Sequence, residues 1–209
     1  MKFIITAGPT REFIDPFRFI SNPSSGKMGY ALARAAVDEG FEVILISGPV
    51  GLPSVPGVVQ VPVVSALEMR EAVKAHFPSA AVVIMAAAVA DYRPRYNSRH
   101  KLKKGGIELS LELERNPDIL EELGEIKGDT ILVGFSAETE NIIDNARKKL
   151  KSKNLDLIIA NDISAPGSGF AGDTNRVVIV DRQGGIEELP LMSKDEVADL
   201  IIKRTMEYL

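Results

Sequence analysis

Two segments of this chain carry side chains whose types and spacing could do chemistry on a phosphate. The segment 11–29 reads REFIDPFRFISNPSSGKMG and ends in small residues and a cation: Ser24, Ser25, Gly26 and Lys27. These residues open a helical pattern, and the free amides of a helix start can hold an anion. The segment 86–94 reads AAAVADYRP and follows an apolar run. We expect both segments at the edge of an α/β sheet, where such sheets bind ligands.

Lysines outside these segments add candidate phosphate contacts. Lys101, Lys103 and Lys104 form a basic cluster, and Lys149 and Lys153 are four residues apart on a predicted helix. That spacing puts the second pair on one helix face, where like charges repel unless an anion lies between them. Taken alone, the cluster at 101–104 favours a solvated surface. Lysines late in a helix also suit the helix dipole, so the second pair is a weak signal by itself.

The helix start at Gly26 can be read in two ways, as an anion site or as small residues packed on a sheet. It is not a P-loop, because Ser21 and Met28 stand where that motif needs a glycine and a serine or threonine. Nor does the segment 6–10 match GxGxxG, since Pro9 and Thr10 replace the required spacing. An ordinary NAD site is therefore disfavoured.

Other kinds of active site find little support in the sequence. The chain has no cysteine, which excludes a disulfide framework, a thiolate metal site and a cysteine nucleophile. Its two histidines, His76 and His100, belong to no cluster with metal-ligand spacing. No GxSxG motif or Ser/His/Asp grouping is present. Electrostatic chemistry on phosphates, with positioned amides and lysines, is what remains.

Length and charge are typical of a small-molecule enzyme or binding protein. The 209 residues suffice for a single domain, 1–209, with a substantial core. A net charge of −4 and a pI of about 5.4 argue against the basic face of a general nucleic-acid binder. Neither a signal peptide nor a membrane span is apparent, so the cytoplasm is the default location.

The order of apolar runs predicts a doubly wound α/β fold with a mainly parallel sheet and helices on both faces. Continuous apolar runs indicate strands that are buried on both sides. They are found at 3–7, 41–47, 58–64, 80–90, 130–135 and 155–160. Helical patterns alternate with them, from Gly26 to before Gly40 and then at 65–76, 139–153 and from 193 onward.

The middle and the end of the chain depart from this alternation. Residues 107–114 alternate strictly between apolar and polar, which predicts a half-buried antiparallel strand as a small β extension. Asn116 and Pro117 are expected to cap and open a helix. The glycine- and serine-rich stretch 163–175 is a predicted loop, and 176–181 with 185–189 predict a closing hairpin.

Several phrases occur together and in order: RFISNPSSGKMG, AAAVADYRP, HKLKK, NPDIL, VGFSAETEN and KNLDLIIAND. As a set, from Ile4 almost to the C-terminus, they resemble phosphopantothenoylcysteine synthetase of the bacterial, CTP-using type. The resemblance implies a Rossmann-like sheet. In many bacteria this synthetase follows a flavin-dependent decarboxylase in one bifunctional coenzyme A biosynthesis protein, so the chain is either a free-standing enzyme or a domain of such a fusion.

The resemblance implies a ligase reaction in two steps. The carboxylate of 4′-phosphopantothenate attacks the α-phosphate of CTP to give an acyl-cytidylate and pyrophosphate, and the amine of cysteine then displaces CMP. Both steps develop negative charge on phosphate oxygens, which calls for cations and amide donors, with Mg²⁺ held through the triphosphate.

The same resemblance assigns roles by motif. Asn22 is expected to act on the acyl-phosphate in the second step, and Lys101 to reach the triphosphate together with Lys149 and Lys153. The cytidine side is framed by Met85, Ala86, Ala87, Asp91, Pro117, Asp118, Ile119, Leu120 and Phe135. Arg18 is a candidate partner for the substrate phosphate, the alternative being a structural salt bridge to Asp15 or Glu12. Two departures from the family pattern, Pro23 and Ser136, touch no group with an assigned role.

The family is dimeric, and the open edge of the alternating strand offers a physical reason for a homodimer. We expect no nucleic-acid or membrane partner. Three alternatives stay open: a Rossmann-type NAD(P)-dependent oxidoreductase, a nucleotide-binding module without turnover, and the same enzyme using ATP, since nucleobases differ by only a few hydrogen bonds.

Overall fold

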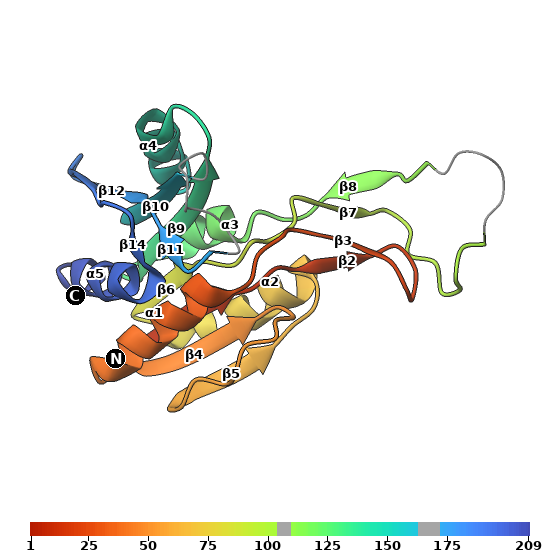
Figure 1. Cartoon of the computed structure of the whole chain (residues 1–209), viewed down its shortest axis with the longest axis horizontal. Coiled ribbons are helices and arrows are strands. Elements are labelled where there is room, and N and C mark those ends of the chain that lie inside the picture. The colour runs from red at the N-terminus through yellow and green to blue at the C-terminus, as the bar shows by residue number, and fades with distance from the viewer. Residues whose placement is uncertain (104–109, 163–171) are drawn as a thin grey trace.

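The computed structural model describes residues 1–103, 110–162 and 172–209, and its centre is an eight-stranded sheet (Figure 1). The sheet has the order β13-β12-β10-β9-β6-β1-β4-β5. Its strands are β1 (Lys2–Ala7), β4 (Glu42–Ser47), β5 (Val58–Pro62), β6 (Val82–Met85), β9 (Ile131–Glu138), β10 (Leu157–Asp162), β12 (Val177–Asp181) and β13 (Ile186–Glu188).

Six neighbouring strands of the sheet run parallel: β5, β4, β1, β6, β9 and β10. The strands β12 and β13 are antiparallel additions at one edge. Taken in chain order, the parallel strands lie in the Rossmann order 3-2-1-4-5-6. The order reverses between β1 and β6, which are direct neighbours with Phe3 opposite Val82. The expected fold, doubly wound and mainly parallel, is confirmed.

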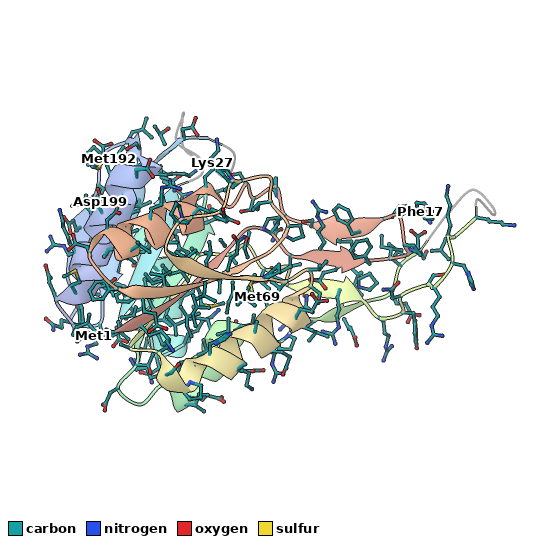
Figure 2. The ribbon with its side chains drawn as sticks, turned by 90° about the horizontal axis from the view of Figure 1, so that it is seen from below. Met1, Phe17, Lys27, Met69, Met192 and Asp199 are labelled. Carbon is teal, nitrogen blue, oxygen red and sulfur yellow. The ribbon has the colours of Figure 1, made fainter. Side chains whose placement is uncertain are left out.

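Helices cover both faces of the sheet, as the apolar strands require. On one face, α1 (Lys27–Asp38) and α5 (Lys194–Met206) share a core with alternate residues of the strands. On the other face lie α2 (Ala66–His76), α3 (Ile119–Ile126) and α4 (Ile142–Ser152). Figure 2 shows the two helical layers with the side chains of the sheet between them. Within the described part of the chain, none of the helices has the length and apolarity that crossing a bilayer needs.

An arm of two β-hairpins extends from the body of the protein (Figure 1). One hairpin pairs β2 (Arg11–Phe13) with β3 (Phe19–Ser21), and the other pairs β7 (Tyr92–Pro94) with β8 (Leu113–Arg115). The hairpins lie side by side, with β2 against β7. A small antiparallel pair, β11 (Thr174–Asn175) with β14 (Met192–Ser193), lies beside α5.

Two predicted elements end or begin elsewhere than expected, and a third is as predicted. The run 80–90 forms a strand only as far as Met85, because Ala86 to Ala90 leave the sheet and pair loosely with the chain after β1, where Thr10 N–H donates to Ala88 O (3.3 Å). Asn116 does not cap α3. Asp118 does, since its side chain accepts from the N–H of Glu121 (3.1 Å). The capping box at Ser193 and Glu196 is confirmed.

The strand expected at 107–114 is described only in part. Residues 107–109 lie outside the described residues, and β8 begins at Leu113, with Leu111 and Leu113 both exposed. β8 is antiparallel to β7, as the alternating pattern predicts. Of the predicted loop 163–175, residues 163–171 likewise lie outside the description, while Thr174 and Asn175 form β11.

Asp156 ties together three segments at the far end of the sheet. It is only 1% exposed, and its carboxylate accepts from the ammonium of Lys127 (2.7 Å), from the guanidinium of Arg182 (2.6 Å) and from the N–H of Leu132 (2.8 Å). A buried carboxylate with this many donors is stable only while all of them remain. Asp156 therefore fixes how β9, β10 and the turn after β12 meet.

We expect Asp156→Ala to lower the free energy of unfolding by about 3 kcal/mol, because it leaves the largely buried ammonium of Lys127 without its counter-ion. Urea denaturation followed by far-UV circular dichroism measures this loss. The control is Glu42→Gln, which removes an exposed ion pair with Lys2 and should change stability by less than about 0.5 kcal/mol. Equal effects of the two variants would contradict the structural role given to Asp156.

Helix α1 begins in direct contact with the end of β1. A Cβ added to Gly29 would lie 2.5 Å from the Cβ of Ala7 and 2.8 Å from the carbonyl oxygen of Thr6. Gly26, which precedes the helix, has a φ of 79°, and a Cβ added to it would lie 2.8 Å from Cγ1 of Val50 and 3.3 Å from Cα of Gly8. Only glycine permits this approach, so the small residues of the segment 24–29 do pack on the sheet.

Gly29→Ala should destabilise the protein by at least about 1 kcal/mol, because the overpacking penalty exceeds the gain in helix propensity, which is itself about 1 kcal/mol. Gly51→Ala is the matched control, since nothing lies within 4 Å of its added Cβ and its backbone is unstrained. Thermal unfolding of both variants tests the prediction. A Gly29→Ala protein as stable as the Gly51→Ala protein would refute it.

Candidate active site

A cavity of about 880 Å³ opens at the carboxyl ends of the parallel strands, at the point where the strand order reverses. This is the position at which open α/β sheets bind ligands. Of the described candidate residues named from the sequence, it collects all except Arg18, Lys101 and Lys103, while Lys104 lies outside the described residues. Those that line it are Asn22, Ser24, Ser25, Gly26, Lys27, Met85, Ala86, Ala87, Asp91, Pro117, Asp118, Ile119, Leu120, Phe135, Lys149 and Lys153.

Asn22 lies between the segment that leaves the arm and the segment that leaves β6. Its side-chain nitrogen donates to the carbonyl oxygens of Ala88 (3.2 Å) and Val89 (3.3 Å). The threonine hydroxyls of the β1 loop support the same segment, because Thr6 accepts from Ala87 N–H (3.1 Å) and Thr10 from Ala90 N–H (3.0 Å). The amide of Asn22 is therefore held in a fixed position on the cavity wall.

The start of α1 presents a cation and backbone amides to the cavity. Gly26 turns the chain in the left-handed region, and its N–H approaches the hydroxyl of Ser24 (3.4 Å). Lys27 forms an ion pair with the exposed carboxylate of Asp173 (2.6 Å) and thereby lowers the pKa of Asp173. An ion pair this exposed contributes little free energy, so Lys27 can exchange its partner for a ligand.

The opposite end of the cavity carries the second pair of lysines. Lys153 contacts the carboxylate of Asp118 (2.6 Å), which also caps α3, and Lys149 contacts Glu138 at the end of β9 (2.7 Å). Lys149 lies in the last turn of α4, and Lys153 is the C-cap residue that directly follows the helix. Each lysine is paired with one carboxylate, so a polyanion entering here would compete with Asp118 and Glu138.

An apolar wall separates the two cationic ends. Met85 and Leu120 are buried, while Ala86, Ala87 and Phe135 are half-buried with surface turned to the cavity. Thr6 donates to the sulfur of Met85 (3.8 Å) and so fixes one side of this wall. Apolar surface with a few oriented polar groups is typical of a pocket for a flat ring.

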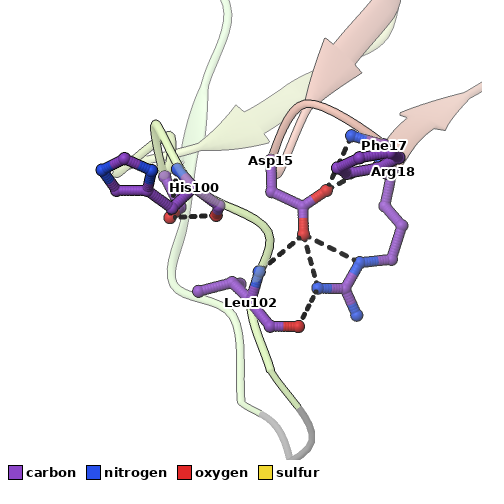
Figure 3. A network of polar contacts seen from close by, with 6 residues as sticks. Asp15, Phe17, Arg18, His100 and Leu102 are labelled. Carbon is purple, nitrogen blue, oxygen red and sulfur yellow. Dashed lines mark hydrogen bonds and ion pairs between the residues drawn. The ribbon is translucent and has the colours of Figure 1, made fainter.

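Arg18 lies between β2 and β3 and Lys101 follows β7, so both are on the arm, and neither lines the cavity of its own chain. Figure 3 shows why Arg18 stays there: its guanidinium donates to the buried carboxylate of Asp15 (2.5 Å) and to the carbonyl oxygen of Leu102 (3.2 Å). These bonds hold the pKa of Asp15 far below its usual range. The salt bridge weighed as the alternative for Arg18 is therefore present. The ammonium of Lys101 lies 5.1 Å from the ring centre of Phe17.

Sequence reasoning missed several residues that line the cavity: Asn116, Ser136, Asn161, Asn175 and Lys194. Asn116 was taken for a helix cap, but its side chain donates to Ala90 O (2.7 Å) and accepts from Arg93 (2.9 Å). Asn161 could have been found as a polar residue at the end of an apolar run. Lys194 gave no such signal. It is almost fully buried, and burial together with Lys27 lowers its pKa.

Two further observations limit the chemistry of the cavity. Among residues 1–103, 110–162 and 172–209, no three His, Asp or Glu side chains are close enough together to hold a metal ion. The connection from β1 to α1, moreover, carries a whole hairpin of the arm, whereas dinucleotide sites use a short glycine-rich turn there. Despite the Rossmann strand order, the NAD(P) alternative is not favoured.

Comparison with known families gives a match over the whole chain. Residues 1–209 match the DNA/pantothenate metabolism flavoprotein C-terminal domain. The chain is 55% identical over 201 residues to the coenzyme A biosynthesis bifunctional protein CoaBC of Bacillus subtilis, covering 96% of this chain and 50% of that protein. It is also 47% identical to a cysteine/cysteine sulfinic acid decarboxylase of an unknown prokaryotic organism, covering 98% of this chain and 58% of that protein. The chain thus spans about half the length of these relatives.

Solved structures agree with this match. The crystal structure of the C-terminal domain of CoaBC superposes with a TM-score of 0.84 at 48% identity, covering 99% of this chain and 94% of that one. Sequence and fold together show that the chain belongs to the DNA/pantothenate metabolism flavoprotein C-terminal domain family.

Proposed function

We propose that this chain is a phosphopantothenate–cysteine ligase of coenzyme A biosynthesis that uses CTP. The observation that carries the proposal is the single cavity that joins Asn22, a helix start with Lys27, and the pair Lys149 and Lys153. Its two cationic ends suit two phosphorylated substrates that must react with each other. The relatives named as CoaBC, which match this chain over about half their length, support the same pathway.

The apolar wall and the α4 lysines suit the nucleotide. The cytosine ring would lie against Phe135 and the segment 85–87, with Asp91 and the start of α3 beside the ribose and base. Lys149 and Lys153 would then exchange Glu138 and Asp118 for triphosphate oxygens, because phosphate is the stronger partner for an ammonium. The carboxylate of Asp118, released in this way, is a suitable ligand for Mg²⁺, which proteins usually hold through one or two carboxylates and the substrate phosphates.

The start of α1 suits the phosphate of the acyl substrate. Ser24, Ser25 and Gly26 offer backbone amides and hydroxyls, and Lys27 adds a charge that its exposed partner Asp173 does not hold tightly. With phosphates at both ends, the carboxylate of 4′-phosphopantothenate and the α-phosphate of CTP would meet near Asn22. Holding two reactants in this way supplies much of the rate enhancement for a reaction that needs no protein nucleophile.

Asn22 would serve the second step. Attack by the amine of cysteine on the acyl carbonyl places negative charge on the carbonyl oxygen before CMP leaves. The side-chain nitrogen of Asn22 is oriented by its bonds to Ala88 O (3.2 Å) and Val89 O (3.3 Å), and it would exchange one of these long bonds to donate to that oxygen. The bond that forms is the amide C–N bond, the bond that breaks joins the acyl carbon to the CMP oxygen, and the amine loses a proton.

A second copy of the chain would supply the missing cation. Lys101 lies on the arm, away from its own cavity, and the arm exposes Phe17 (67%) and Tyr96 (75%), which a partner would cover. We therefore propose a homodimer in which the arm of one protomer brings Lys101 to the triphosphate bound by the other. The fused half of the longer relatives remains a separate candidate partner.

The purified protein should convert 4′-phosphopantothenate, cysteine and Mg-CTP into 4′-phosphopantothenoylcysteine, with release of pyrophosphate and CMP. Mass spectrometry of the amide, alongside a pyrophosphate assay, measures both steps. Replacing CTP by ATP tests which nucleobase the cavity selects. Incubation with cysteine alone, followed by measurement of carbon dioxide, tests whether the protein is instead a cysteine decarboxylase. Amide formed only with ATP would contradict the CTP site. No amide with either nucleotide would contradict the ligase.

Mixing two inactive variants tests the shared site. Lys101→Gln should slow formation of the acyl-cytidylate at least about a hundredfold by removing one triphosphate cation, and Asn22→Asp should form the acyl-cytidylate but stall before the amide. In a mixed dimer, one cavity keeps Asn22 and receives an intact Lys101 from its partner. A refolded equal mixture should therefore recover roughly a quarter of the wild-type rate, as statistical pairing gives.

Each variant refolded alone is the control and should stay inactive. A mixture no more active than its two components would mean that Lys101 serves its own chain or does not reach the triphosphate. Analytical ultracentrifugation of the same samples shows whether dimers formed, so that failed mixing is not mistaken for a negative result.

A further inference from the structure

Two buried polar atoms in the described structure have no hydrogen-bond partner, and both belong to residues that line the cavity. They are Oγ of Ser136, a residue 8% exposed, and Oδ1 of Asn175, a residue 3% exposed. Nearly all buried polar atoms in native proteins are satisfied, because an unpaired one costs free energy of desolvation. Unpaired atoms confined to a binding cavity indicate positions where a ligand completes the bonding.

The two residues lie on opposite faces of the sheet. Ser136 alternates with Phe135 on β9, so it lies on the face covered by α3 and α4, with the α4 lysines. Asn175, on β11, lies on the α1 face, where its side-chain nitrogen contacts the sulfur of Met28 in the first turn of α1 (3.7 Å). Sulfur is a weak acceptor, so this contact orients the amide with little energy. β11 is held in turn by pairing with β14, where Asn175 is opposite Met192.

We propose that Asn175 is a substrate-recognition residue, whose Oδ1 accepts a hydrogen bond from an N–H or O–H group of the acyl substrate bound at the start of α1. This rests on the proposed function, which puts 4′-phosphopantothenate at that end of the cavity. The single free hydroxyl and the amide N–H of that substrate are donors of the required kind. The ammonium of cysteine has the same chemistry and is the second source to be distinguished.

The chemistry of the side chain favours a donor group over the substrate phosphate. Oδ1 can only accept, whereas a phosphate at neutral pH presents acceptors. The phosphate has its own partners nearby in Lys27 and in Lys194, whose ammonium donates to the carbonyl of Gly172. Asn175 would thus bind the part of the substrate that distinguishes 4′-phosphopantothenate from other phosphorylated acids. Such a contact makes Asn175 a specificity determinant.

The decisive variant is Asn175→Leu, whose side chain has the same branched arrangement of four heavy atoms and no polar atom. Because Oδ1 is unpaired in the free protein, its removal should leave the melting temperature unchanged or higher. The KM for 4′-phosphopantothenate should rise about three- to tenfold, as expected for one lost hydrogen bond, with the KM for CTP unchanged. A residue with a merely structural role would show the opposite pattern, a lower melting temperature and no selective change in KM.

The variant Asn175→Asp tests whether residue 175 faces a hydrogen-bond donor or an anionic group of the ligand. Aspartate keeps an acceptor at the same place, so its KM for the acyl substrate should rise less than that of the leucine variant. A larger rise than in the leucine variant would mean that the residue faces the phosphate and would overturn the proposal. Ser136→Ala removes the other unpaired atom and is a reference for the thermal effect of such a deletion.

The three KM values also identify the source of the donor. A rise confined to 4′-phosphopantothenate supports the proposal as stated, and a rise confined to cysteine assigns the bond to the amine. A rise confined to CTP, or no rise, overturns the proposal. If the wild-type protein makes no amide, the proposed ligase activity is wrong, and calorimetry tests the inference independently. Wild type and Asn175→Leu are then titrated with 4′-phosphopantothenate, cysteine and CTP. The inference is overturned if both proteins bind 4′-phosphopantothenate and cysteine with equal affinity, or if the wild type binds neither.

Discussion

The close approach of α1 to β1 is the contact on which the cavity depends. Gly29 and Gly26 let the helix start within van der Waals contact of Ala7, Thr6 and Gly8, at the strand next to the reversal of strand order. A side chain at either glycine would push the helix away from the sheet and with it the amides and the cation of Lys27. The same small residues therefore provide both packing and a ligand site, and these two readings of the sequence are not exclusive.

Ion pairs of unequal burial divide the protein into a fixed part and an exchangeable part. Asp156, at the base of β10, is buried among Lys127, Arg182 and the backbone of β9, and none of these can be replaced without a large penalty. At the carboxyl ends of the strands, the pairs of Lys27, Lys149 and Lys153 remain partly in water. A weak pair of this kind keeps a lysine oriented before a ligand arrives, and breaking the pair costs little free energy.

Local sequence predicted the elements well and the site in part, for physical reasons. Apolar runs such as 3–7 and 41–47 must be buried on both faces, so their strands could be predicted without knowing what covers them. Lys27 could be predicted from its place at a helix start, whereas Asn22 was assigned through the family resemblance. Asn175 could not be found in this way, because its role depends on pairing with Met192 and on contact with Met28, far away in the chain. Lys101 shows a different limit, since its motif was visible but its distance from the cavity was not.

The arm is continuous with the cavity wall at three points. β3 ends at Ser21, directly before Asn22; Asp91 directly precedes β7; and β8 ends at Arg115, two residues before Pro117 and the start of α3. No flexible linker separates any of these cavity residues from its arm strand. Whatever fixes the arm must therefore also bias the positions of Asn22, Asp91 and the start of α3. By thermodynamic reciprocity, the factor by which binding at the arm changes the affinity of the cavity for its ligand is also the factor by which that ligand changes binding at the arm.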